Sequence, residues 1–205
     1  MNEFRPERDD LWGTACMSYQ VQFVLSPAAR TALADLSSAL TRYARDGLWV
    51  QPAESLHVTC YSLVSPRETY DKGRYWEKAA EAANTCMRLM EAEVSGFTLC
   101  FDHLRVTNRA IIALAAEVPM VAQARSIFAQ SIPQPPVAVG PPTTTHVTLC
   151  RYRNPASIDP DLPHTASHMF SSIRADIREA VLVRELTYPS LRAEIVCSAA
   201  LHMPT

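Results

Sequence analysis

The sequence predicts an α+β fold built from two pseudo-symmetric, βαβ-rich lobes with antiparallel sheets around a central cleft. The tripeptide His-Val-Thr occurs at residues 57–59 and again at residues 146–148, each time in surroundings rich in β-prone residues. Around both tripeptides the pattern of residues indicates the same order of elements: helix, strand, helix, hairpin. The chain has 205 residues, of which 48% are hydrophobic, and this is enough for a sizeable core.

A strand and a helix are expected first. Apolar and polar residues alternate over residues 17–25, which is the period of a half-buried strand. Ser26 and Pro27 then supply a helix cap and a first-turn proline, and leucines recur at helical spacing until Gly47. A proline-containing turn leads into the first His-Val-Thr strand.

A second helix and a hairpin should follow this strand. Residues 65–68 read Ser-Pro-Arg-Glu, the pattern of a capping box, so we expect a helix from there towards Glu93, with or without an interruption at Gly73. Two strand-like runs, residues 97–106 and 110–118, flank the turn-prone sequence Thr-Asn-Arg and predict a hairpin.

The second half of the chain repeats this order. A short helix over residues 119–131 precedes the second His-Val-Thr strand, and an amphipathic stretch over residues 163–178 follows it. Two final strands are expected at residues 181–188 and 192–201. The proline-rich segment 131–142 is a loop that either connects elements or forms a flap beside the site.

Charge and composition exclude some classes of function. A formal net charge of −2 lacks the basic excess of proteins that hold long nucleic acid through its phosphates, so a small or short substrate fits better. No run of 18 apolar residues is present, and the charged first residues do not resemble a signal peptide. We therefore expect a cytoplasmic monomer that does not bind membranes.

Cofactors and metals are not expected. The 6 cysteines contain no Cys-x-x-Cys pair and fit small buried hydrophobic residues, although Cys60 and Cys150 follow the two motif histidines closely. His164 and His168 have the i, i+4 spacing of zinc ligands but lack a following Glu and a third ligand, so a zinc-dependent hydrolase is the weaker alternative. With 5 glycines there is no glycine-rich phosphate loop.

The two tripeptides carry residues suited to phosphoryl chemistry. Side chains two apart on a strand point to the same face, so His57 projects with Thr59, and His146 projects with Thr148. Two such pairs across a cleft would supply a base, an acid and two neutral donors around one phosphate. A single strand histidine is more often structural, but two matched pairs are not explained in that way.

These residues carry a resemblance to a known family. The run W-V-x-P-x-E-x-L-H-V-T at 49–59, the run H-V-T-L-x-R at 146–151 and the duplicated order of elements resemble the 2H phosphoesterase superfamily, particularly its 2′-5′ RNA ligase and cyclic phosphodiesterase branch. The resemblance spans nearly the whole chain. It implies two lobes around a cleft and metal-independent cleavage of 2′,3′-cyclic phosphate or 2′-5′ linked nucleotides.

The resemblance also implies roles for particular residues. His57 and His146 would be the acid/base pair, and Thr59 and Thr148 would bind phosphate. Residues 1–205 would then form a single catalytic domain made of two lobes, each contributing one motif strand. The expected partner is a nucleotide or a short RNA end. A nucleotide-binding module without significant turnover remains the alternative, and a turnover assay separates the two.

Further residues are candidates for substrate contacts. Strict alternation places Tyr61 and Tyr152 on the same face as the histidines, where their rings could stack on a nucleobase or fill the wall of the groove. Gln20 falls on the same face if the first strand joins that sheet, and so does Gln22. The same alternation turns Arg151 away from the site.

Overall fold

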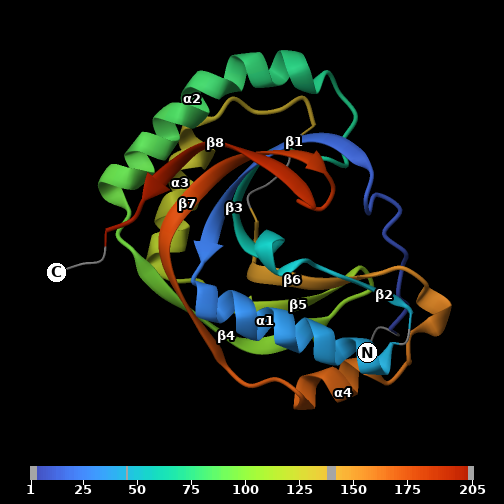
Figure 1. Cartoon of the computed structure of the whole chain (residues 1–205). Coiled ribbons are helices and arrows are strands. Elements are labelled where there is room, and N and C mark those ends of the chain that lie inside the picture. Colours follow the sequence, from blue (N-terminus) through green and yellow to red (C-terminus); the bar gives the residue numbers. More distant parts are fainter. Residues whose placement is uncertain (1–3, 45, 138–141, 203–205) are drawn as a thin grey trace.

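The computed structural model describes residues 4–44, 46–137 and 142–202 (Figure 1). The α+β class is confirmed: helices and strands are interspersed along the described chain, and the strands form one antiparallel sheet. The strands are β1 (Ala15–Leu25), β2 (Leu48–Val50), β3 (His57–Val64), β4 (Phe97–Val106), β5 (Ala110–Ala115), β6 (Thr145–Tyr152), β7 (Ile173–Thr187) and β8 (Arg192–Ala200). The helices are α1 (Pro27–Leu40), α2 (Lys72–Glu93), α3 (Pro119–Ser131) and α4 (Leu162–His168), with short 3₁₀ turns at Thr41–Tyr43, Ala53–Ser55 and Pro155–Ser157.

The strands of the two predicted lobes belong to one sheet. Its order is β1-β3-β6-β5-β4-β7-β8, and an additional pairing of β1 with β7 closes six of these strands into a ring. The two motif strands, β3 and β6, meet at a single register pair in which Val58 lies opposite Val147. The central residues of the two tripeptides therefore face each other across the junction of the two lobes.

The two halves of the sequence exchange their hairpins. The hairpin of the first half, β4 and β5, pairs with β6, the motif strand of the second half. The β7–β8 hairpin of the second half instead pairs with β1, which lies beside β3. Each lobe is thus assembled from both halves of the chain.

Helices cover the sides of the strands (Figure 1). On α1, Ala29, Leu33 and Leu40 are buried at helical spacing, and the helix contacts β6 and β7. Helix α2 packs on α3 and β8, and α3 packs on β3. This cover gives the motif strands a buried apolar side, to which Val58 and Val147 belong, and leaves their opposite side for polar residues.

Several predicted element boundaries are wrong. Ser65 does not cap a helix: its hydroxyl accepts from the Arg67 N–H in a short turn, and α2 begins at Lys72. Asp71 caps that helix by accepting from the Arg74 N–H, and the helix runs through Gly73 without interruption.

Other boundaries also differ from the prediction. Helix α1 ends at Leu40 and gives way to a 3₁₀ turn, well before Gly47. The amphipathic stretch at 163–178 is helical only to His168, and from Ile173 it belongs to β7, because it extends a long strand that pairs with β1 and β4. Strand β2 lies where the sequence predicted only a turn.

The sequence also led to expectations about the cysteines, the proline-rich loop and membrane-spanning helices. All 6 cysteines are free thiols, with Cys60, Cys86 and Cys150 buried but Cys100 exposed. Part of the proline-rich loop, residues 138–141, lies outside the described residues. No helix in the described ranges is both long enough and apolar enough to cross a bilayer.

Candidate active site

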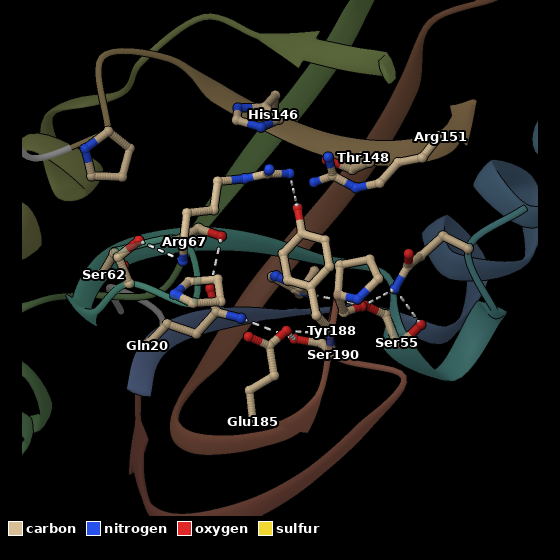
Figure 2. A pocket seen from close by; sticks show the side chains of 17 residues that line it. Gln20, Ser55, Ser62, Arg67, His146, Thr148, Arg151, Glu185, Tyr188 and Ser190 are labelled. Carbon is tan, nitrogen blue, oxygen red and sulfur yellow. Dashed lines mark hydrogen bonds between the residues drawn. The ribbon is translucent and has the colours of Figure 1, made fainter. Parts of the chain in front are cut away.

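A polar pocket of about 260 Å³ lies where the two motif strands meet (Figure 2). Its lining includes the four residues that the sequence singled out: His57, Thr59, His146 and Thr148. Val58 and Val147 lie opposite each other as a register pair, and both side chains point into the core. The His and Thr on either side of each valine therefore project from the other face of the sheet, into the same space. The structure thus brings together two imidazoles and two hydroxyls from segments far apart in the sequence.

His57 is held in one orientation by the backbone. Its Nδ1 lies 2.8 Å from the carbonyl oxygen of Ser55. A carbonyl oxygen only accepts, so Nδ1 carries the proton and Nε2 keeps a free lone pair when the ring is neutral. Burial lowers the pKa of His57 to about 4, with nearby His146 and Arg151 acting in the same direction.

His146 has a different neighbour. Its Nδ1 lies 3.0 Å from the hydroxyl oxygen of Thr144, a group that can donate or accept. The proton of a neutral His146 can therefore reside on Nε2. Burial lowers the pKa of this histidine too, and Arg151 and Arg125 add to the effect. A backbone hydrogen bond to Thr144 raises the pKa of His146 in opposition, as the one to Ser55 does for His57, and His146 differs by its additional contact with the Thr144 hydroxyl.

A β-bulge corrects the prediction for Tyr61. On β3, Thr59 lies opposite Gln22 but Tyr61 lies opposite Val21, so Cys60 is an extra residue without a partner of its own. The bulge reverses the alternation, and Tyr61 turns into the core, where it is 6% exposed and stacks on Phe128. The pocket receives Ser62 instead.

The second motif strand has a bulge at the matching position. Thr148 lies opposite Ile112 and Cys150 lies opposite Ile111, which leaves Leu149 as the extra residue of β6. Tyr152 is consequently fully buried, and its hydroxyl donates to the Thr107 carbonyl at 2.7 Å.

The same bulge brings Arg151 to the pocket, where strict alternation had turned it away. Ser62 lies five residues after His57, and Arg151 lies five residues after His146. The two bulges therefore bring equivalent positions of the two motif strands into the pocket.

A cluster of charged residues forms one wall of the pocket, and no pattern in the sequence predicts that its members come together. Arg67, from the loop before α2, donates to the hydroxyl of Tyr188 at 2.8 Å, and both Arg67 and Arg151 lie over the Tyr188 ring at 5.2 Å (Figure 2). Asp9 forms ion pairs with both guanidinium groups. These residues come from four separate segments of the chain.

A second polar network lies beside Thr59. The Thr59 hydroxyl donates to Gln20 Oε1 at 3.4 Å, and Gln20 Nε2 in turn donates to Ser190 Oγ at 2.9 Å. Glu185 accepts from both the backbone N–H and the hydroxyl of Ser190. Burial raises the pKa of Glu185. Gln20 thus lines the pocket as predicted, while Gln22 is mostly buried and also donates to Ser190.

Metal-binding residues are not gathered in this region. Within the described ranges, no three His, Cys, Asp or Glu side chains come together as a metal site would require. His164 and His168 contact each other on α4, with ring centroids 4.6 Å apart, and neither lines the pocket.

Comparison with known proteins identifies the fold. The protein TT0787 of Thermus thermophilus superposes with a TM-score of 0.62 at 18% identity, over 92% of this chain and 100% of that one. A phosphoesterase of known structure gives a TM-score of 0.60 at 18% identity, over 91% and 99% of the two chains. Escherichia coli LigT bound to 3′-AMP gives 0.59 at 14% identity, over 92% and 99%.

Neither a scan against protein-family models nor a search of curated proteins found a match. The predicted α+β fold is therefore the fold of these three solved structures, and the similarity extends over nearly the whole chain.

Proposed function

We propose that the protein is a metal-independent phosphodiesterase that hydrolyses 2′,3′-cyclic phosphate or 2′-5′ linked nucleotides or RNA ends by two-histidine acid/base catalysis. The observation that carries the proposal is the convergence of both His-Val-Thr pairs on one polar pocket. Two imidazoles supply proton transfer to and from oxygen, while hydroxyl and guanidinium groups stabilise charge on phosphate.

The surroundings of the two rings suggest a division of labour. His57 Nε2, with its free lone pair, takes a proton from the attacking water as the new oxygen–phosphorus bond forms. His146, in its imidazolium form, gives its Nε2 proton to the leaving oxygen as the bond from phosphorus to that oxygen breaks, and is left as a neutral imidazole. The protein thereby ends the step with one proton gained and one lost.

The phosphate itself would be held by neutral and cationic donors. Thr148 presents a hydroxyl to the pocket, and Arg151 presents a guanidinium from the same strand. Thr59 would turn its hydroxyl proton from Gln20 Oε1 to the phosphate. A guanidinium is suited to the planar, charge-assisted hydrogen bonds that phosphate oxygens accept.

Nucleotide ligands of a structural neighbour support the choice of substrate. LigT has been crystallised with 3′-AMP, phosphate, NADP+ and ATP, and each of these structures matches the chain with a TM-score of at least 0.55. We infer by similarity that this pocket also takes a nucleotide phosphate.

From its charge and composition we further propose that the protein is a cytoplasmic monomer. Light scattering would test the oligomeric state, and cell fractionation would test the compartment.

The deciding experiment is a turnover assay. The protein is incubated with 2′,3′-cyclic nucleotides, 2′-5′ dinucleotides and RNA ends, and the phosphomonoester product is identified with its position on the sugar. Product formation supports the proposal. Binding without product would favour a nucleotide-binding module.

Activity is expected to persist in excess EDTA, because the proposed mechanism draws its base, acid and donors from protein side chains. The rate with each active substrate is compared before and after prolonged dialysis against chelator. If the rate is lost and only zinc restores it, the zinc-dependent alternative is correct instead.

The pH profile of kcat/KM should be bell-shaped and lie on the acidic side of neutrality. A base with a pKa lowered to about 4 becomes neutral and competent above that pH, which sets the lower limb. An acid whose pKa lies below the ordinary 6.5 loses its proton as pH rises, which sets the upper limb. A bound anion favours imidazolium, so the upper limb of kcat should lie at higher pH than that of kcat/KM. A kcat/KM that keeps rising above pH 7 would contradict these assignments.

A further inference from the structure

The segment before β1, residues 4–14, is packed against both lobes. The Asp9 N–H donates to the Tyr152 carbonyl on β6, and the Gly13 N–H donates to the Tyr188 carbonyl at the end of β7. The ring of Trp12 stacks on Trp49 of β2, with centroids 5.3 Å apart. These contacts fix the segment beside the pocket and hold the Asp9 side chain at 3% exposure.

The carboxylate of Asp9 joins the two arginines of the pocket wall. Its Oδ2 lies 3.0 Å from Arg151 Nη1, and its Oδ1 lies 3.2 Å from Arg67 Nη2. The Leu11 N–H also donates to Oδ1. Asp9 itself is absent from the pocket lining, whereas both arginines line it. The carboxylate thus stands behind the two guanidinium groups, on the side away from the space that a ligand would occupy.

This arrangement sets the charge that a ligand meets. Among the described residues that line the pocket, the ionisable side chains besides the two histidines are Arg67, Arg151, Glu185 and Tyr188. Asp9 offsets one of the two guanidinium charges from behind. The arginine wall therefore presents one net positive charge in place of two.

One net positive charge in place of two reduces the electrostatic advantage that a doubly charged phosphate has over a singly charged one. A phosphodiester carries a single negative charge, whereas a phosphomonoester, with a second pKa of about 6, carries nearly two at pH 8. Resting on the function proposed above, we propose that Asp9 is a specificity-determining residue that lowers the affinity of the pocket for the doubly charged monoester more than its affinity for the singly charged diester. Such a difference would help the product to leave a site that the substrate enters.

The test compares two ligands that differ by one charge. These are 2′-deoxyadenosine 3′-monophosphate and its 3′-methyl ester, which share one nucleoside and lack the 2′-hydroxyl needed for cyclisation. Their Kd values are measured by calorimetry at pH 8 for the unmodified protein and for Asp9→Asn. Removing the carboxylate charge should raise monoester affinity relative to diester affinity by about 5- to 10-fold, as expected for one extra charge at a partly solvated site.

Three further variants guard against a purely structural effect. Arg67 is half-exposed, and Arg67→Gln should shift the same ratio in the opposite direction, while the double variant Asp9→Asn/Arg67→Gln restores the charge and should restore the ratio. Glu7→Gln is the matched control, because Glu7 lies on the same segment but pairs with Arg109, which does not line the pocket. Thermal unfolding of each variant confirms that it is folded.

The outcomes separate this inference from the proposed function. If Asp9→Asn leaves the ratio unchanged, or weakens both ligands equally, Asp9 only supports the arginines and the inference is wrong even where turnover is observed. If Asp9→Asn does not fold, the ratio for Arg67→Gln decides alone, and an unchanged ratio rejects the inference. A protein whose ratio responds as described but which turns over no substrate retains the inference and loses the proposed catalysis.

Discussion

Replacing either motif histidine with alanine is expected to lower kcat/KM by about 10²-fold or more, because each variant lacks one of two proton-transfer groups. His57→Ala removes the proposed base and His146→Ala removes the proposed acid. The double variant should be little worse than either single variant, since groups that act as a unit have strongly non-additive effects. The measurement is kcat/KM on the most active substrate of the panel.

The control for this experiment is another histidine. His103 is exposed on β4 and its Nδ1 lies 2.6 Å from Asp102, away from the pocket, so His103→Ala should retain full activity. Circular dichroism and thermal unfolding would show whether each variant is folded. A folded His57→Ala or His146→Ala protein with near-normal turnover would rule out the two-histidine mechanism.

Arg151→Gln should cause the other large loss, about 10- to 10²-fold in kcat/KM. The charge-assisted hydrogen bond to phosphate that it removes contributes about 1.5 to 3 kcal/mol. Glutamine keeps a polar side chain of intermediate length but carries no charge, and it leaves buried Asp9 with Arg67 as its remaining ion-pair partner among the described residues. Some loss of thermal stability is therefore expected as well. Kinetics at a temperature well below unfolding separate the two effects.

The neighbouring tyrosine supplies the matched control. Tyr152→Phe removes the buried hydrogen bond to the Thr107 carbonyl and leaves the pocket lining unchanged, so activity should be retained with a stability cost of about 1 kcal/mol. Strict alternation along β6 predicts the reverse, with Tyr152 in the site and Arg151 outside it. A Tyr152→Phe variant that loses activity while Arg151→Gln keeps it would show that the bulge is absent in solution.

The predicted placement of four site residues could succeed because it depends on short-range geometry. Residues two apart on a strand share a face whatever the rest of the fold does, so His57 with Thr59, and His146 with Thr148, were placed together from spacing alone. That the two pairs meet was inferred from the duplication and is explained by the register pair of Val58 and Val147.

The errors at Tyr61, Tyr152 and Arg151 have one cause. An extra residue in each strand inverts the alternation beyond it, and the only trace in the sequence is a pair of adjacent apolar residues, Cys60-Tyr61 and Leu149-Cys150. Such pairs also occur in strands buried on both faces, so the pattern alone could not distinguish them.

Other parts of the pocket depend on contacts between distant segments. Asp9 meets Arg67 and Arg151, and Gln20 meets Ser190 of the β7–β8 hairpin, only after the lobes have formed. No local pattern marks such a carboxylate as part of a site. The capping box at residues 65–68 failed for a related reason, since a serine that satisfies a nearby N–H in a turn has the same sequence signature as one that caps a helix.

The exchange of hairpins between the halves bears on how the nascent chain can fold. Strand β1 leaves the ribosome early, but its partner β7 is made only after residue 173, near the end of synthesis. Until then one edge of β1 and its apolar residues lack their native cover, which favours association with other chains. The first half of the gene therefore does not encode an autonomous folding unit, and chaperone demand should be highest just before β7 emerges from the exit tunnel.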